Sequence, residues 1–284
     1  MTTERPVPSA EEVWQTYDRM EARLTTPLTQ RMLELADVGP GMRILDLATG
    51  RGEPAIPAAH RVRPGGSVLG IDLSPSMLAM ARRRAAEEGV TNLELRAMSA
   101  ASLGELPAGH FHATLVRWGL MYMDSPVAVL AGARRATIPE GSLVLAVLAE
   151  PERCSYFSLP RRVLEKYRPL PQIEPASPGP FRYADVERLR LDVELADLTI
   201  EHVEELVVPV MEAKTTDEVI TWVRAFGLTQ LLNELPASAQ QSWEDEFARE
   251  TEALRSDGYI RLECATRIVV AAGRVATVPA SLGV

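Results

Sequence analysis

The chain has 284 residues and a formal net charge of −9 at pH 7; 46% of its residues are hydrophobic and 24% are charged. This length is sufficient for one large domain with a buried core, and the composition is that of an ordinary globular protein. The negative charge argues against a phosphate-backbone partner, so we expect a small-molecule substrate and no nucleic acid.

Three further features constrain the class of protein. No apolar run is long enough to span a bilayer, and the polar N-terminus lacks the apolar centre of a signal peptide. We therefore expect a cytoplasmic protein without a membrane span. Cys154 and Cys264 are the only cysteines and lack the spacing of metal ligands, which predicts reduced thiols and no metal site.

Helices and strands alternate along the first half of the chain. Residues 10–38 are predicted to be helical, and strands are expected at 43–47, 67–73, 92–98, 112–119 and 142–150. Helices are expected from about residue 54 and at 76–89 and 127–137, with Ser74 and Pro75 as N-cap and first-turn residues, and 139–141 as a turn. This alternation indicates βαβ units and a parallel sheet.

The second half has a different pattern. Residues 168–181 are proline-rich and predict an irregular segment, 185–198 predict a helix, and 199–211 predict a strand. A long helical insert at about 216–257 precedes a final strand at 259–273. The sheet is therefore expected to close with two strands separated by a helical cap.

The stretch ILDLATGRGEPA, residues 44–55, predicts a ligand loop at the end of the first strand. It fits a dinucleotide fingerprint from Gly50 and an S-adenosylmethionine (SAM) loop from Asp46. A carboxylate at Asp46 would repel a pyrophosphate and attract the ammonium of a methionine moiety. Asp72, at the end of the second strand, suits two ribose hydroxyls and serves either cofactor. Asp46 therefore favours SAM.

These motifs resemble the class I SAM-dependent methyltransferases, in particular the ubiquinone/menaquinone-biosynthesis type and related natural-product enzymes. The resemblance rests on residues 44–55, with Ala48 where many members have glycine, on VLGIDLSPSMLAMARRRA (68–85), and on 111–147. It implies a Rossmann-like α/β fold: a seven-stranded, mostly parallel sheet whose last strand is antiparallel. The implied organisation is an N-terminal helical segment (1–40) over the cofactor, a core (41–214 and 258–276), and a helical cap (215–257) over the substrate.

The resemblance also implies the residues that hold SAM. Asp46, Thr49, Gly50 and Gly52 would contact the cofactor, Asp72 would hold the ribose, and Leu73 and Met77 would flank the adenine. Where relatives often have an acid for the adenine, this chain has AMS (97–99), so that Met98 and Ser99 would take its place. The complete expected cofactor set is Asp46, Ala48, Thr49, Gly50, Gly52, Asp72, Leu73, Met77, Met98, Ser99 and Arg117.

Histidine is the usual general base, but strand direction places none of the four near the reacting group. His110 and His112 begin the fourth strand and His202 the sixth, whereas ligands bind beyond the carboxyl ends; His60 falls late in a helix. Tyr17 is the candidate polar group near the methyl, with aromatic packing as the other interpretation. The charged run ARRRAAEEG (81–89) is expected to be a solvated helix face. Expected substrate residues are Trp14, Trp118, Met121, Tyr122, Trp222 and Phe226.

The sequence thus predicts methyl transfer from SAM to a small, bulky and apolar acceptor, with oxygen as the favoured atom and S-adenosylhomocysteine as product. A quinone-like or natural-product acceptor, and a role in secondary metabolism, follow from the resemblance. Three alternatives remain: a SAM-binding enzyme with a non-methyl reaction such as cyclisation, an NAD-dependent oxidoreductase, and a non-enzymatic interaction module. The sequence makes no prediction of oligomeric state.

Overall fold

The computed structural model describes residues 10–171, 174, 177–225 and 228–273. The chain divides into two compact units, each assembled from separate stretches. The unit that we call the sheet unit contains Arg31–Val147, Val186–Glu204 and Ile268–Val284; the helical unit contains Met1–Gln30, Leu148–Asp185 and Glu205–Arg267. The domain boundaries expected from the sequence follow function, not compactness, and stay a prediction.

Five parallel strands form most of the sheet. They are β1 (Arg43–Leu47), β2 (Ser67–Asp72), β3 (Leu93–Ala97), β4 (Phe111–Arg117) and β5 (Thr137–Leu148). β1 lies between β2 and β4, so that Leu45 pairs with Leu69 on one side and Thr114 on the other. Because β1 is buried on both faces, its apolar residues are uninterrupted except at Asp46.

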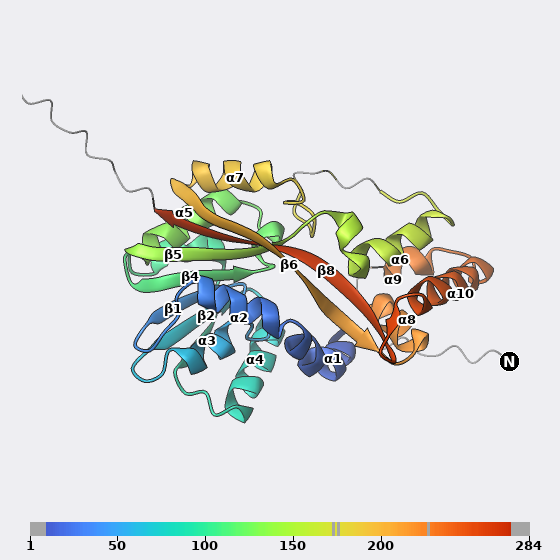
Figure 1. Cartoon of the computed structure of the whole chain (residues 1–284), viewed down its shortest axis with the longest axis horizontal. Coiled ribbons are helices and arrows are strands. Elements are labelled where there is room, and N and C mark those ends of the chain that lie inside the picture. The colour runs from blue at the N-terminus through green and yellow to red at the C-terminus, as the bar shows by residue number, and fades with distance from the viewer. Residues whose placement is uncertain (1–9, 172–173, 175–176, 226–227, 274–284) are drawn as a thin grey trace, which may run out of the picture. The chain divides into compact units, whose positions relative to one another are not determined.

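Seven strands follow one another in the order β3-β2-β1-β4-β5-β8-β6, with β6 spanning Leu198–Ala213 and β8 spanning Tyr259–Gly273. β8, the last strand of the chain, is antiparallel to its neighbours (Figure 1). The two-residue β7 (Arg255–Ser256) pairs with β8 outside this path. The expected Rossmann-like sheet with an antiparallel last strand is confirmed.

The turn predicted at residues 139–141 was wrong, because β5 runs through it. Between the pairs Phe111–Thr137 and Ala113–Ser142 the register shifts, so that a bulge in β5 accommodates the extra residues. The backbone approaches closely there: a Cβ on Gly141 would lie 2.4 Å from the carbonyl oxygen of His112. Glycine and proline at this position therefore mark a bulge and not a break between elements.

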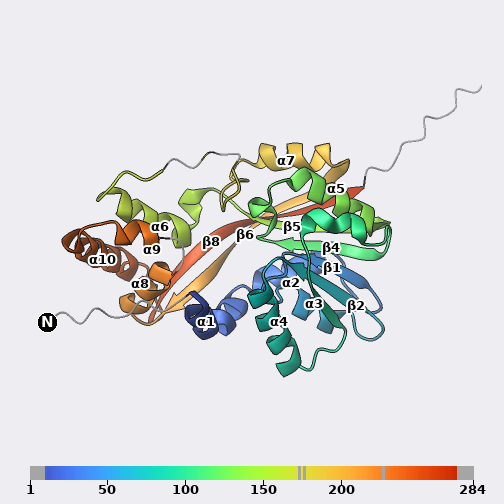
Figure 2. The same ribbon diagram turned by 180° about the vertical axis from the view of Figure 1, so that it is seen from behind.

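Helices cover both faces of this sheet. α2 (Thr26–Leu35) and α3 (Ala55–Arg61) lie below β4 and β5 in Figures 1 and 2, and α5 (Pro126–Ala136) lies above them. α4 (Pro75–Glu87) begins as its sequence predicts, because the Ser74 side chain accepts a hydrogen bond from the Met77 amide at 3.3 Å. Two short 3₁₀ helices, η1 (Ala100–Glu105) and η2 (Leu120–Tyr122), follow β3 and β4.

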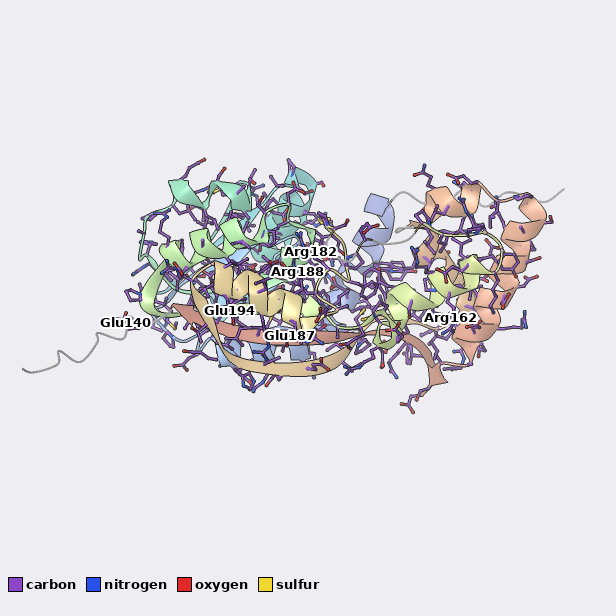
Figure 3. All side chains as sticks on the ribbon, turned by 90° about the horizontal axis from the view of Figure 1, so that it is seen from above. Glu140, Arg162, Arg182, Glu187, Arg188 and Glu194 are labelled. Atoms are coloured by element: carbon purple, nitrogen blue, oxygen red, sulfur yellow. The ribbon has the colours of Figure 1, made fainter. Side chains whose placement is uncertain are left out.

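α7 (Val186–Leu195) packs beside α5 and presents a charged surface to solvent. Figure 3 labels Glu187 and Glu194 along it. Its buried side carries Leu189, Val193 and Asp192, and Arg188 reaches Asp192 one turn away at 3.4 Å. The i, i+4 ion pair therefore neutralises a carboxylate that the helix buries.

The helical unit has its own core. The helices of this unit are α1 (Ala10–Leu24), η3 (Pro151–Arg153), α6 (Ser155–Glu165), α8 (Thr216–Ala225), α9 (Thr229–Asn233) and α10 (Ala237–Glu252). Trp222, Trp243 and Phe247 are buried in one apolar cluster, and the rings of Trp243 and Phe247 stack at 4.9 Å. No helix in the described part of the chain has the length and apolar character that a membrane span requires.

Candidate cofactor site

The loop after β1 owes its shape to positive φ angles. Ala48, Gly50 and Gly52 have φ of +55°, +54° and +93°. A Cβ on Gly52 would lie 2.6 Å from Cδ1 of Ile56, so this position accepts only glycine. The Gly52 amide donates to the Thr49 carbonyl at 2.9 Å, which closes the turn before α3. Ala48 and Gly50 are the partly exposed residues of this loop at the carboxyl end of β1, whereas Thr49 and Gly52 are buried.

Asp46 is fully buried near the end of β1, and part of its carboxylate has no partner. Its Oδ2 accepts a hydrogen bond from the Ala55 amide at 3.1 Å, whereas Oδ1 makes none. The Thr49 hydroxyl is close enough to lower the Asp46 pKa, yet its Oγ1 is equally without a hydrogen bond. Burial is the larger effect and raises the pKa of Asp46 to about 7. Asp46 Oδ1 is thus a buried acceptor without a hydrogen-bond partner, and the Thr49 hydroxyl beside it is a buried group that can both donate and accept.

Asp72 joins this loop to the next helix. At the carboxyl end of β2, its Oδ2 accepts from the Gly50 amide and its Oδ1 from the Ser74 amide, both at 2.8 Å. Each carboxylate oxygen has a second acceptor site, so two ribose hydroxyls can still be bound. Leu73 beside it is 73% exposed and Met77 is half-buried, and their place beside an adenine stays a prediction.

Met98 and Ser99 follow β3 at the same edge of the sheet. The Met98 amide donates to the Asp72 carbonyl at 3.0 Å, which fixes the two strand ends together. The Ser99 side chain accepts from the Ala101 amide at 3.1 Å and caps η1. Their role toward an adenine stays a prediction, with a buried thioether and a half-buried hydroxyl in place of the acid that relatives have there.

The sequence did not predict a cluster of buried charged side chains next to this loop. Arg84 of α4 donates to the Arg51 carbonyl at 3.0 Å and to Glu53 Oε1 at 2.9 Å, and these three residues are at most 9% exposed. The run 81–89 was interpreted as a solvated face; among its charged residues this is wrong for Arg84, whereas Arg82 and Arg83 are exposed. Arg84 lies on the side of α4 that packs on the sheet, and its partner is 31 positions earlier.

Arg117 ends β4 and extends the same cluster. Burial lowers the pKa of its guanidinium, and the charges of Glu53 and Asp46 act in the opposite direction. Its Cζ lies 4.9 Å from the ring centroid of Trp118, a cation–π contact. A charged group of each sign, Arg117 and Asp46, therefore lies at the carboxyl ends of adjacent strands.

The backbone after β4 is tightly packed against the loop after β1. Trp118 has a φ of +54°, and a Cβ on Gly119 would lie 2.6 Å from the Cβ of Ala48. Of the expected substrate residues that follow, Met121 is buried at 2% exposure and Tyr122 is 49% exposed. Their contact with a substrate stays a prediction.

The expected substrate residue Trp222 and the catalytic candidate Tyr17 both lie in the helical unit. Tyr17 and Trp222 meet edge to face with ring centroids 4.9 Å apart. Burial raises the pKa of Tyr17, and the charge of Glu218 adds to this effect. Phe226 and the side chain of Trp14 lie outside the described residues.

The histidines occupy the positions expected from strand direction. His112 lies at the start of β4, where its Nδ1 accepts from the Arg43 amide at 2.9 Å. His60 is 3.2 Å from Glu88 and His202 is 2.8 Å from Glu204, both in exposed pairs. His110 packs edge to face on Phe111 at 5.0 Å. No described histidine lies at the carboxyl ends of β1, β2 or β4.

A cavity of about 440 Å³ opens elsewhere in the sheet unit. Its lining includes Ser67, Leu93 and Phe111, the first residues of β2, β3 and β4. It therefore lies toward the amino ends of these strands, away from Asp46 and Asp72, and is not the cofactor site. Among the described residues no cluster of metal ligands occurs.

Comparison with known proteins identifies the class. A family model described as a methyltransferase domain matches residues 44–141. Demethylmenaquinone methyltransferase of Thermus thermophilus is 33% identical over 156 residues, which cover 54% of this chain and 69% of that protein. Aklanonic acid methyltransferase DauC of Streptomyces sp. strain C5 is 35% identical over 116 residues, 41% of this chain and 52% of that protein. The match thus spans about half the length of this second relative.

Solved structures share the fold. A SAM-dependent methyltransferase from Aquifex aeolicus superposes with a TM-score of 0.53 at 18% identity, covering 70% of this chain and 93% of its own. The [4+2]-cyclase SpnF also gives 0.53 at 18% identity, with 95% and 97% coverage. At these identities the likeness concerns the fold alone.

The fold and the glycine loop define a SAM-binding Rossmann-like protein. The chain belongs to the class I SAM-dependent methyltransferase family. A buried carboxylate whose Oδ1 has no hydrogen-bond partner, Asp46, disfavours a pyrophosphate at this loop, in agreement with SAM as the cofactor.

Proposed function

We propose that the chain transfers a methyl group from SAM to a small, bulky and apolar organic acceptor, on oxygen, and releases S-adenosylhomocysteine. The observation that carries the proposal is the unpaired buried Oδ1 of Asp46, which lies beside the Thr49 hydroxyl and a glycine loop. An unpaired buried acceptor costs about 1–3 kcal/mol, so its retention indicates a ligand that pairs with it. The named methyltransferases among its relatives support the reaction type.

In this proposal, residues of the loop and of the neighbouring strand ends bind different parts of the cofactor. Asp46 and Thr49 accept hydrogen bonds from its ammonium, and Arg117 attracts its carboxylate. Asp72 accepts from the ribose hydroxyls. Leu73, Met77, Met98 and Ser99 surround the adenine, while Ala48, Gly50 and Gly52 allow the close backbone approach that their positive φ angles create.

The bound cofactor supplies an electrophilic methyl group, and the protein supplies position and a dry environment. In-line displacement requires the acceptor oxygen close to the methyl carbon and water excluded. With no histidine at the described strand ends that carry the loop, we propose that proximity and desolvation provide the rate. The acceptor then arrives already ionised; Tyr17, whose pKa burial raises, is kept as a hydrogen-bond donor.

A bulky apolar acceptor is supported by aromatic side chains in the helical unit. Tyr17 contacts Trp222 at 4.9 Å, Tyr156 lies 6.3 Å from Trp222 and 4.8 Å from Phe157, and Phe157 lies 5.6 Å from Phe181. All except Trp222 are partly exposed. Such a row offers ring faces and edges to an apolar molecule. We propose residues 215–257 as the part of the chain that selects the acceptor, and 1–40 as the part that covers the cofactor.

Two measurements test the proposal in order. Calorimetry with SAM, S-adenosylhomocysteine and NAD should show binding of the first two and none of NAD. Methyl-labelled SAM is then incubated with hydroxyquinones, phenols and aliphatic alcohols, and label should pass to an acceptor oxygen of the first two classes. SAM binding with the acceptor converted but unlabelled would replace methyl transfer by a reaction such as cyclisation. Binding of NAD alone would overturn the cofactor assignment.

A further inference from the structure

The two cysteines of the chain lie against each other in the helical unit. Cys154 directly precedes α6, and Cys264 lies in β8. Both are free thiols, and they are 0% and 2% exposed. Nothing in the proposed methyl transfer uses either of them.

Backbone contacts fix the two residues opposite one another. The Ser155 side chain accepts from the Glu263 amide at 2.9 Å and donates to the Glu263 carbonyl at 3.4 Å. The Cys154 thiol is 3.6 Å from the Ala265 carbonyl oxygen, which also accepts from the Ala149 amide at 2.9 Å. Cys264 lies between Glu263 and Ala265, so these bonds hold the segment that begins α6 beside the part of β8 that contains Cys264.

The surroundings make the two thiols unequal. The Cys264 thiol is close enough to Cys154 to lower the pKa of the Cys154 thiol, against the opposite effect of burial, whereas the neighbouring Cys154 and burial both raise the pKa of Cys264. Cys154 also occupies the N-cap of the eleven-residue α6 and follows Arg153, and both a helix N-terminus and a nearby cation favour a thiolate. Arg153 and Glu263 are exposed, so the thiols lie one residue beneath the surface.

We propose that Cys154 and Cys264 form a reversible intramolecular disulfide, with Cys154 as the thiol that reacts first with a hydroperoxide. The Cys154 thiolate attacks a peroxide oxygen, the O–O bond breaks, and one water is released as Cys154 becomes a sulfenic acid. The Cys264 sulfur displaces the hydroxyl, which leaves as a second water. In sum, two thiols and one hydrogen peroxide give one disulfide and two waters. The bond would tie α6 to β8.

Peptide mapping of the whole protein tests the disulfide without any substitution. Native protein is treated with hydrogen peroxide, quenched with catalase, unfolded in guanidinium, alkylated and digested with trypsin. We expect peptide 154–161 (CSYFSLPR) linked to peptide 262–267 (LECATR), two hydrogens lighter than their sum and separated by dithiothreitol. Recovery of both peptides singly alkylated, or a disulfide that forms only when the oxidation is done in denaturant, would overturn the proposal.

Two matched variants test which of the two thiols reacts first with the peroxide. Cys264→Ala should keep the peroxide reaction and accumulate sulfenic acid on Cys154, which dimedone traps. Cys154→Ala should react at least tenfold more slowly, because it removes the thiol whose anion is favoured. Equal rates, or faster reaction of Cys264, would refute the assignment of Cys154 as the attacking thiol. SAM binding by each variant reports whether it is folded, and the mapping above stands if neither folds.

Discussion

Replacing Asp46 by asparagine should stabilise the cofactor-free protein at neutral pH while weakening SAM binding. The Asp46 pKa is raised from an ordinary value of 3.8 to about 7, mainly by burial, and the side chain is fully buried. A shift of that size corresponds to roughly 4 kcal/mol against folding when the carboxylate is ionised. Asparagine keeps the acceptor for the Ala55 amide and removes the charge.

The sign of the pH effect follows from the raised folded-state pKa. Below about pH 4, Asp46 is protonated in both states and has no such cost. Between pH 4 and 7 the folded protein holds a proton that the unfolded chain has released, so stability falls by up to ~1.4 kcal/mol per pH unit. Above pH 7 the loss is complete. Wild type should therefore lose about 2–3 kcal/mol between pH 5 and 8 through this residue alone.

Urea unfolding at pH 5 and pH 8 measures this difference. The stability of Asp46→Asn relative to wild type should improve by about 2–3 kcal/mol from the lower to the higher pH, and any constant cost of the unpaired asparagine amide, ~1–3 kcal/mol, cancels in that comparison. Asp37→Asn, at an exposed aspartate of the sheet unit, is the matched control and should show no such change.

Calorimetry should show that Asp46→Asn weakens SAM binding, although the same substitution stabilises the cofactor-free protein. A charge-assisted hydrogen bond contributes ~1.5–3 kcal/mol, so Asp46→Asn should bind SAM at least tenfold more weakly at pH 8. The wild-type affinity should rise from pH 5 to 7 as Asp46 ionises, and the variant should lack that rise. Unchanged affinity, or a variant whose relative stability falls toward pH 8, would refute the placement of the ammonium at Asp46.

Three further substitutions test the site. Asp72→Ala should weaken SAM binding at least tenfold in calorimetry with the circular dichroism spectrum retained, since it removes charge-assisted bonds of ~1.5–3 kcal/mol each; unchanged affinity would put the ribose elsewhere. His112→Asn should leave turnover within a few-fold, whereas loss of a general base costs ~10²–10⁴-fold, and such a loss would contradict the base-free mechanism. Gly119→Ala should lower stability by ~1–3 kcal/mol in thermal unfolding, because its Cβ would lie 2.6 Å from that of Ala48, whereas Gly104→Ala, with no atom within 4 Å, should not.

The sheet was predictable because its signals are local. β1 and β8 have the bounds that their apolar runs predict, and Ser74 caps α4 as expected. Asp46 and Asp72 could be placed at the same edge because parallel strands end together. Each of these predictions depended only on the residues next to it in the sequence.

The charge cluster could not be predicted in the same way. Arg84 lies in a run of three arginines, of which Arg82 and Arg83 are exposed, and only the packing of α4 on the sheet decides which one is buried. Its partner Glu53 comes from a different loop. The bulge in β5 was missed for a related reason: PEG has the composition of a turn, and only the pairing with β4 shows that the strand continues.

Arg84, Arg117, Glu53 and Asp46 influence one another's charge in the sheet unit. With Asp46 protonated these four groups carry a net charge of +1, and with Asp46 ionised they are neutral. In the proposed binding mode, a zwitterionic amino-acid moiety adds no net charge but brings a cation to Asp46 and an anion to Arg117. It therefore favours the ionised form of Asp46 that burial disfavours. By this argument, cofactor binding offsets part of the free-energy cost of the buried carboxylate in the cofactor-free protein. This accounts for a carboxylate at a position where the fold alone would be more stable without it.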